Sequence, residues 1–223
     1  MSEELLECIE LSTGTDIAAS VIWLHGLGAD GNDFVPIVQE LNLEGCPAIR
    51  FIFPSAPVIP VTINGGYQMP AWYDILGADL IAREDSKGIR TSARQIEKLI
   101  EKEEDRGIAS TNIILAGFSQ GCAMVLHTGL RYPKKLGGLV ALSGYLPLAS
   151  SLGAERSTVN TTIPIFMAHG LMDSVVPISR AEVSRQILLS LGYSVDWHTY
   201  PMQHSVHPEE IRAIGMFLQS ALS

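Results

Sequence analysis

The chain has 223 residues, of which 47% are hydrophobic and 17% are charged, and its net charge is −9. This composition is typical of a globular protein, and the length predicts a single domain over residues 1–223. The acidic charge, with no cluster of Lys and Arg, argues against a nucleic-acid partner. The absence of a signal-peptide pattern or a long apolar span predicts a cytoplasmic protein without stable membrane insertion.

Apolar strands alternate with amphipathic helices along the chain. In chain order, strands are expected over residues 5–11, 18–24, 49–53, 113–116, 138–142, 163–168 and 195–200, and helices around 34–41, 86–106, 120–130 and 208–222. The helix 86–106 carries one apolar stripe, formed by Ile89, Ala93, Ile96 and Ile100. Strands bounded by Gly and Pro that alternate with helices predict an α/β fold, with a mostly parallel central sheet covered by helices on both faces.

Residues 55–88 interrupt this alternation. A connection of this length inside a compact domain is usually functional or disordered, and the apolar and aromatic side chains of this stretch argue against disorder. We therefore predict a lid-like loop or a pocket wall near the strand ends. The alternative is a short extra hairpin that only packs against the domain.

Residues 117–121 read Gly-Phe-Ser-Gln-Gly and lie directly between the strand 113–116 and the helix that begins at Gln120. A G-x-S-x-G pattern at so sharp a turn holds the serine in strained backbone geometry with its hydroxyl exposed. The flanking glycines avoid a collision between a side chain and the neighbouring strand or helix. The pattern predicts Ser119 as a catalytic nucleophile, and the alternative is a glycine-rich turn that contains a serine by chance.

A serine nucleophile needs a base, an acid that orients the base, and donors for the oxyanion. In α/β-hydrolases the acid and then the histidine follow the serine along the chain. Asp173 comes just after a buried strand, where open α/β sheets place their chemistry, whereas Asp196 lies near the start of its strand. Asp173 is therefore the predicted acid; otherwise it is a turn or helix-cap aspartate.

Three histidines follow Asp173. His198 lies inside a strand and is expected to pack or pair within the core. His204 lies in the loop between the last strand and the last helix, closer to the strand end than His207, so His204 is the predicted base. His207 is the reserve, with an ordinary role near the helix cap as the alternative. Two earlier histidines that precede glycines are expected to brace loops: His25 and His169.

The oxyanion hole is expected to combine the N–H of Gln120, directly after the nucleophile, with one from the early glycine loop over residues 25–31. Leu27 is the candidate for this second donor, because the glycines beside it let the backbone approach a substrate closely. The same loop contains a G-x-G-x-x-G pattern, the dinucleotide fingerprint. That interpretation needs a carboxylate at the end of the next strand, and the strand 49–53 ends without one.

Together these motifs resemble the acyl-protein thioesterase/carboxylesterase branch of the α/β-hydrolases, also called the phospholipase/carboxylesterase family. The resemblance covers nearly the whole chain, and the matching segments are Leu24–Gly31, Met69–Ile75, Gly117–Gly121, Gly170–Asp173 and the segment around His204. It implies an α/β-hydrolase fold, a triad of Ser119, Asp173 and His204, and the oxyanion donors Leu27 and Gln120. It also implies homodimers that can cover the site. Cys122 departs from the pattern, because relatives usually carry a glycine there.

The predicted activity is that of a serine esterase or thioesterase that needs no metal or organic cofactor and acts on a small ester or an acylated substrate. An apolar groove for the acyl group is predicted under the 55–88 loop, lined by Leu27, Ile63, Met69, Trp72 and Leu76. Trp72 could instead only pin the loop to the sheet. The nearer alternatives are a serine peptidase and a lysophospholipase, then a non-catalytic binding protein, and the most remote is a dinucleotide-binding oxidoreductase.

Overall fold

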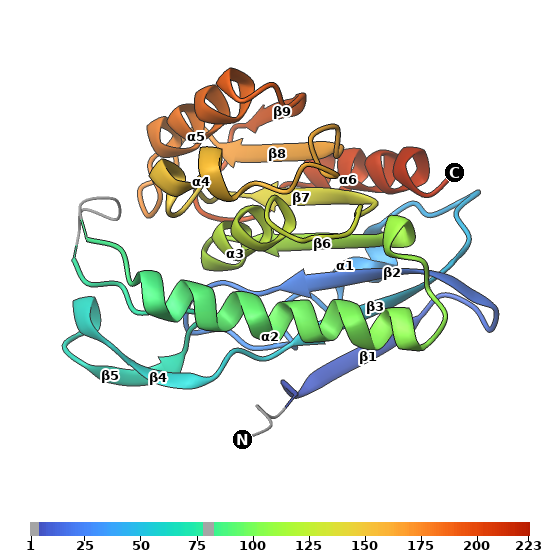
Figure 1. Cartoon of the computed structure of the whole chain (residues 1–223), viewed down its shortest axis with the longest axis horizontal. Helices are drawn as coiled ribbons and strands as arrows, with labels where there is room; N and C mark the ends of the chain where they lie inside the picture. Colours follow the sequence, from blue (N-terminus) through green and yellow to red (C-terminus); the bar gives the residue numbers. More distant parts are fainter. Residues whose placement is uncertain (1–4, 78–82) are drawn as a thin grey trace.

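The computed structural model describes residues 5–77 and 83–223 and contains a seven-stranded sheet with helices on both faces (Figure 1). The strand order is β1-β3-β2-β6-β7-β8-β9, and every neighbouring pair is parallel except β1 with β3. The strands are β1 (Cys8–Ser12), β2 (Ile17–Leu24), β3 (Ala48–Pro54), β6 (Ile113–Phe118), β7 (Gly138–Leu142), β8 (Ile165–Gly170) and β9 (Val195–Tyr200). The helices are α1 (Ile37–Glu40), α2 (Ser86–Asp105), α3 (Gln120–Gly129), α4 (Ala149–Glu155), α5 (Ile178–Ser190) and α6 (Pro208–Ala221). The predicted α/β fold with a mostly parallel sheet is confirmed.

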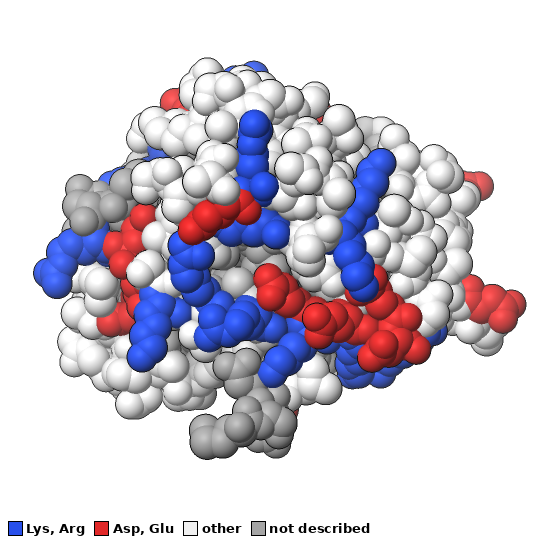
Figure 2. All heavy atoms as spheres, viewed as in Figure 1, with Lys and Arg blue, Asp and Glu red and all other residues white. Residues whose placement is uncertain are grey.

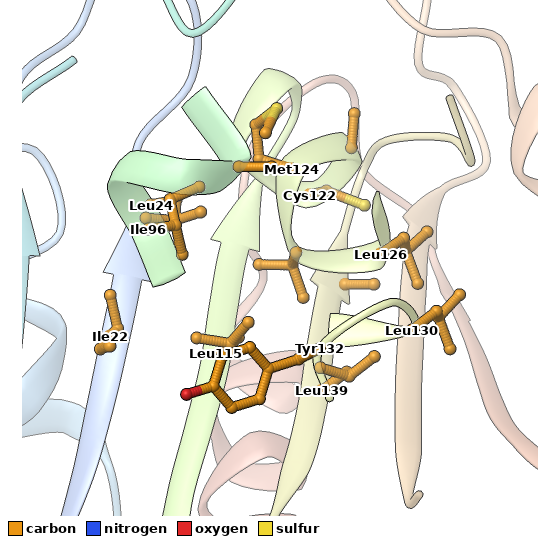
Figure 3. Packing of buried hydrophobic residues seen from close by; sticks show 14 of the residues in the cluster. Ile22, Leu24, Ile96, Leu115, Cys122, Met124, Leu126, Leu130, Tyr132 and Leu139 are labelled. Carbon is orange, nitrogen blue, oxygen red and sulfur yellow. The ribbon is translucent and has the colours of Figure 1, made fainter. Parts of the chain in front are cut away.

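Two hydrophobic clusters join the helices to opposite faces of this sheet. One contains buried apolar side chains from α2, α3, α4 and α5, and the other contains buried apolar side chains from α1 and α6. Figure 3 shows part of the first cluster, where Cys122 and Leu126 of α3 pack with Leu115 of β6 and Leu139 of β7. Each fully buried Leu or Ile contributes about 1.5–3 kcal/mol relative to an exposed one. This packing holds the ends of β6 and β8, which carry the candidate site.

Three helical segments differ from the prediction. α1 has only four residues, because a series of turns between residues 30 and 36 takes the place of the expected first helical turn. α4 and α5 were not predicted from the sequence. The apolar side chains of α5 do not form one stripe, since Val183 and Leu189 are exposed while Ala181 and Leu188 are buried. Periodicity alone therefore does not reveal this helix.

Most of the 55–88 stretch, called the insertion below, has regular structure. β4 (Val58–Val61) and β5 (Tyr67–Pro70) form an antiparallel hairpin, separate from the main sheet and closed by the 3-10 turn Thr62–Asn64. After β5 the chain returns to the main body, where Trp72 and Tyr73 are buried. A hairpin is what the alternative predicted, but this stretch does not only pack, because Ile63, Tyr73 and Ile75 line the cavity described below. Residues 78–82 of the predicted lid lie outside the described residues.

Charged side chains of both signs are intermixed on the face that α2 covers (Figure 2). Two ion pairs join α2 to neighbouring segments: Arg90 pairs with Glu155 of α4 at 2.6 Å, and Glu104 pairs with Lys134, in the connection from α3 to β7, at 2.9 Å. Exposed pairs of this kind contribute about 0–1 kcal/mol each, so they add little to stability. In the part of the chain that the structure describes, no helix is both long and apolar enough to cross a lipid bilayer.

Candidate active site

Ser119 lies at the tip of the turn between β6 and α3. Its φ is 56° and its ψ is −116°, a backbone conformation that residues other than glycine rarely adopt. The Ser119 N–H donates to the carbonyl of Leu142 at 2.8 Å, which ties the turn to the neighbouring strand. A Cβ at Gly121 would lie 2.3 Å from the Leu24 carbonyl oxygen, and one at Gly117 would lie 2.6 Å from the backbone of Gly121. Only glycine fits at these two positions, as the elbow motif requires.

The loops that carry Asp173 and His204 follow two neighbouring strands and lie against each other. Gly170, the last residue of β8, is in register with Tyr200, the last residue of β9. A Cβ at Gly170 would lie 2.4 Å from the carbonyl oxygen of Gln203. This close backbone approach brings Asp173 beside His204, at the same edge of the sheet as Ser119.

The side chains of Ser119, His204 and Asp173 form one chain of hydrogen bonds. His204 Nδ1 lies 2.7 Å from Asp173 Oδ2, and His204 Nε2 lies 2.9 Å from Ser119 Oγ. Because an ionised carboxylate can only accept, Nδ1 carries the proton and Nε2 is free to accept the serine hydroxyl proton. The three residues selected from the sequence are therefore in contact, in the order that acyl transfer requires.

Neighbouring groups hold the carboxylate of Asp173 in place. Its Oδ1 accepts the N–H groups of Val175 and Val176, both at 2.9 Å. His169 Nε2 donates to the Val176 carbonyl at 2.7 Å and lies 3.3 Å from Asp173 Oδ2. Burial lowers the pKa of His169, so this ring is a neutral brace for the loop. The bracing role agrees with the prediction, whereas nothing in the sequence pattern indicated the two backbone donors.

The backbone N–H groups of Leu27 and Gln120 belong to the two segments that flank Ser119. Gln120 is the first residue of α3, so its N–H has no acceptor inside the helix. Within the described residues, the N–H of Leu27 has no hydrogen-bond partner. A Cβ at Gly26 would lie 3.3 Å from the Cβ of Ser119, which shows how closely the glycine loop passes this serine. Both donors are available to a ligand beside Ser119.

His25 fixes the peptide that carries the Leu27 donor. Its Nε2 accepts the N–H of Ala56 at 2.9 Å, so Nδ1 carries the proton and donates to the Gly26 carbonyl at 2.7 Å. This carbonyl and the N–H of Leu27 belong to one planar peptide group, so holding the first orients the second. Burial lowers the pKa of His25, and the neutral ring keeps its acceptor nitrogen.

A cavity of about 640 Å³ opens beside Ser119, a size typical of small-molecule sites. Its largely apolar wall is formed by the glycine loop, the insertion, the elbow and the segment after Asp173, together with Tyr145 after β7 and His204 after β9. The apolar and aromatic side chains on this wall include Leu27, Ile63, Tyr73, Ile75, Phe118, Tyr145 and Val176. The ring of Phe118 also packs on the imidazole of His204, with centroids 4.7 Å apart. This contact limits the orientations open to the His204 ring.

Only some of the residues that were predicted to line the acyl groove lie on the cavity wall. Leu27 and Ile63 lie on the cavity wall. Leu76 lines a much smaller hollow that adjoins the cavity at Tyr73. Met69 lies on β5 outside the cavity lining, with its sulfur 3.4 Å from the side-chain nitrogen of Asn64.

Trp72 lies in the core instead of on the cavity wall. Its side chain belongs to the first hydrophobic cluster, the residue is only 2% exposed, and its indole N–H donates to the His25 carbonyl at 2.9 Å. A buried indole needs such an acceptor, and the end of β2 supplies one. The position of Trp72 agrees with the alternative that it pins the insertion to the sheet.

The remaining candidates lie away from the relay. Asp196 and His198 pair with each other at 2.9 Å on the outer strand β9. His207 precedes α6, and its Nδ1 accepts the N–H of Glu209 at 3.2 Å as a helix cap. Cys122 is fully buried, and burial raises the pKa of its thiol, so it serves as packing rather than as a nucleophile.

Comparison with known proteins identifies the family. The phospholipase/carboxylesterase family profile matches residues 9–222. The chain belongs to this family. It is 41% identical to acyl-protein thioesterase 1 of Gibberella zeae over 92% of this chain and 91% of that protein. It is 38% identical to acyl-protein thioesterase 1 of Saccharomyces cerevisiae, over 92% and 93% of the two chains. The crystal structure of Zea mays acyl-protein thioesterase 2 superposes with a TM-score of 0.84 at 29% identity, covering 97% and 99% of the two chains.

Family membership confirms the resemblance seen in the motifs and makes this chain a hydrolase of ester or thioester bonds. The glycine loop fits this assignment rather than nucleotide binding. A Cβ at Gly31 would lie 2.5 Å from the Phe53 carbonyl oxygen, and the Gly31 N–H donates to Ser55 Oγ at 3.1 Å. This glycine is used for packing against the end of β3, and the helix that a dinucleotide would need directly after the loop is absent from the described residues 31–36.

Proposed function

We propose that this hydrolase cleaves the ester or thioester bond of an acylated molecule through an acyl-enzyme on Ser119. The observation that carries the proposal is the hydrogen-bonded chain of Ser119, His204 and Asp173 at the edge of a cavity of about 640 Å³. The two relatives named acyl-protein thioesterase 1 support a thioester as one substrate class.

The reaction has two acyl-transfer steps. In the first, Ser119 Oγ attacks the substrate carbonyl while His204 Nε2 takes the hydroxyl proton, and the same nitrogen then gives that proton to the departing thiolate or alkoxide. In the second, His204 takes a proton from water, the hydroxide attacks the acyl-enzyme, and the proton returns to Ser119 Oγ as the carboxylic acid leaves. Asp173 remains ionised throughout and stabilises the imidazolium form of His204.

The negative charge on the carbonyl oxygen is proposed to lie between the N–H groups of Leu27 and Gln120. Each such donor is typically worth about 3–4 kcal/mol of transition-state stabilisation. The brace from His25 to the Gly26 carbonyl and the start of α3 at Gln120 hold both donors before the substrate binds. The geometry therefore needs little rearrangement during the reaction.

We infer that the acyl chain occupies the part of the cavity next to the insertion, where Ile63 and Ile75 contribute apolar surface. The insertion would then act as a fixed pocket wall within one domain that spans residues 1–223. The single sheet, whose strands come from both ends of the described chain, supports this domain assignment. A cytoplasmic location and a homodimer stay predictions.

The test is hydrolysis of p-nitrophenyl esters from acetate to palmitate, together with an S-palmitoyl peptide, a lysophospholipid and a peptide anilide. We expect Ser119→Ala to lower kcat by a factor of about 10⁵–10⁶, and Asp173→Asn to lower it by about 10⁴, because the first removes the nucleophile and the second disturbs the tautomer of His204. Ser205→Ala, an exposed serine next to the base, is the matched control and should keep its activity.

Ester hydrolysis that survives in Ser119→Ala would contradict the proposal. The substrate panel separates the related activities: turnover of the peptide anilide alone would indicate a peptidase, and a strong preference for the lysophospholipid would indicate a lysophospholipase.

A further inference from the structure

Gln120 has a second role that triad chemistry does not require. Its side chain is buried, and both of its polar atoms bind the insertion: Oε1 accepts the N–H of Trp72 at 2.8 Å, and Nε2 donates to the carbonyl of Tyr73 at 2.7 Å. A primary amide thus pairs with one donor and one acceptor of adjacent residues, as the backbone of a neighbouring strand would. Asn is the other natural side chain that ends in a primary amide, and it is one methylene shorter.

From these two bonds, a series of contacts leads to the cavity wall. Tyr73 lines the cavity itself. The next residue, Asp74, accepts the N–H and the hydroxyl of Thr62 at 2.7 and 2.5 Å, and the carbonyl of Ile75 accepts the N–H of Ile63 at 2.9 Å. Ile63 and Ile75 both line the cavity. Among the described residues of the insertion, Ile63, Tyr73 and Ile75 on the cavity wall are therefore linked to the segment that Gln120 holds.

Gln120 is also the polar link between this wall and the nucleophile. Within the described residues, the elbow of residues 117–121 makes hydrogen bonds to the insertion only through the Gln120 side chain. The backbone of the same residue follows Ser119 directly and is the proposed oxyanion donor. One residue would thus position both parts of the substrate: its backbone N–H would bind the oxygen of the reacting carbonyl, and its side chain holds the wall that would contact the acyl chain.

We propose that the side-chain amide of Gln120 is a positioning residue for substrate selection, which holds the insertion wall at a fixed place relative to Ser119. The inference rests on the proposed function. An acetyl group extends only one carbon beyond the reacting carbonyl, whereas an octanoyl chain must lie along Ile63, Ile75 and Tyr73. Displacement of the wall therefore affects long acyl chains more than short ones.

The measurement is the ratio of kcat/KM for p-nitrophenyl octanoate to that for p-nitrophenyl acetate. Gln120→Leu keeps the approximate volume of the side chain but removes both hydrogen bonds. We expect both activities to fall in this variant, and the ratio to fall by about tenfold, the effect of one or two buried hydrogen bonds. The decrease should come mainly from a higher KM for the octanoate.

Gln120→Glu separates hydrogen bonding from packing. A protonated carboxyl offers one O–H donor and one carbonyl acceptor, the pattern of the native amide, whereas a carboxylate faces the Tyr73 carbonyl without a donor. Burial favours the protonated form. We expect the ratio to equal that of the wild type at about pH 5.5 and to fall towards that of Gln120→Leu as the carboxyl ionises.

The wild type measured over the same pH range supplies the baseline, because the other titratable groups of the cavity are common to all variants: Asp33, Tyr73, Tyr145, Arg180 and His204. Gln186→Glu, on the exposed side of α5, is the matched control for an added carboxylate. Urea unfolding of each variant checks that the protein is folded under the assay conditions.

Two outcomes would overturn the proposal: an unchanged ratio in Gln120→Leu, or a ratio in Gln120→Glu that stays as low as that of Gln120→Leu even at the lowest pH. Neither outcome affects the proposed function, which fails only if the wild type hydrolyses no ester or thioester, or if Ser119→Ala retains the activity.

Discussion

The two sides of the candidate site are built in different ways. On the triad side, Asp173 and His204 follow directly after two paired strands, and Ser119 occupies a turn in which backbone packs on backbone. On the wall side, the glycine loop and the insertion are held by hydrogen bonds between side chains and distant backbone groups, such as that from Ala56 to His25. Steric contacts at strand ends thus place Ser119, Asp173 and His204, whereas buried polar contacts shape the space around them.

This contrast predicts that substitutions on the two sides of the site will differ in severity. A backbone overlap leaves no rotamer or small shift that relieves it, so a substitution at the elbow should be severe. A single buried hydrogen bond contributes about 0.5–1.5 kcal/mol, and leaving one partner unsatisfied costs about 1–3 kcal/mol. Substitutions on the wall side should therefore be moderate and should alter selectivity before they prevent folding.

The largest effect is expected from Gly121→Ala. The added methyl group would lie 2.3 Å from the Leu24 carbonyl oxygen and 2.7 Å from that of His25, so β2 and α3 must separate. We expect a loss of more than about 3 kcal/mol in the free energy of unfolding, measured with urea. Any folded protein should also lose about 100-fold or more in kcat/KM, because Ser119 and the glycine loop move apart.

The matched control for this change is Gly153→Ala in α4. There the nearest atom to the new Cβ is a side-chain carbon of Leu191 at 3.9 Å. A helical glycine that gains a methyl group in open space should stabilise the protein by about 0.5–1 kcal/mol. Equal effects of the two substitutions would contradict a sterically determined elbow.

The sequence selects three residues that the structure brings into contact, because the signals on the triad side are local. An apolar strand followed without spare residues by Gly-x-Ser-x-Gly and a helix identifies Ser119, and position after a strand separates Asp173 from Asp196. The wall side depends on partners that no local pattern reveals. Trp72 is apolar and lies in the insertion, so it was predicted to line a groove, yet its indole N–H binds a carbonyl 47 residues earlier in the chain. The same limit applies to the amide of Gln120.

An intermediate effect is expected from Glu210, which supports the loop after His204. This carboxylate is fully buried and accepts the N–H of His207 at 3.1 Å, while its Oε1 has no partner within the described residues. Burial raises its pKa from 4.5 to about 7. Because the folded-state pKa is the higher one, the folded protein binds more protons between these values, and stability falls as the pH rises through that window.

The shift corresponds to roughly 3 kcal/mol once the pH exceeds both values. We expect Glu210→Gln to lose this slope, so that the variant is less affected than the wild type when urea unfolding is compared at about pH 5 and pH 8. Glu209→Gln, whose carboxylate is exposed, is the control and should keep the slope of the wild type. The same pH dependence in all three proteins would show that the triad side does not rely on this buried carboxyl.

The smallest effect is expected from Ser92→Ala on the wall side. The Ser92 hydroxyl donates to the Trp72 carbonyl, and both residues are buried. Its loss leaves that carbonyl without a donor, so we expect a decrease of about 1–2 kcal/mol in the free energy of unfolding. Ser190→Ala is the matched control, because its hydroxyl donates to the Ile187 carbonyl at an exposed helix end and its loss should cost less than about 0.5 kcal/mol. An equal loss of unfolding free energy in Ser92→Ala and Ser190→Ala would show that buried polar contacts do not hold the insertion. The packing of Trp72 alone would then have to explain the position of the insertion.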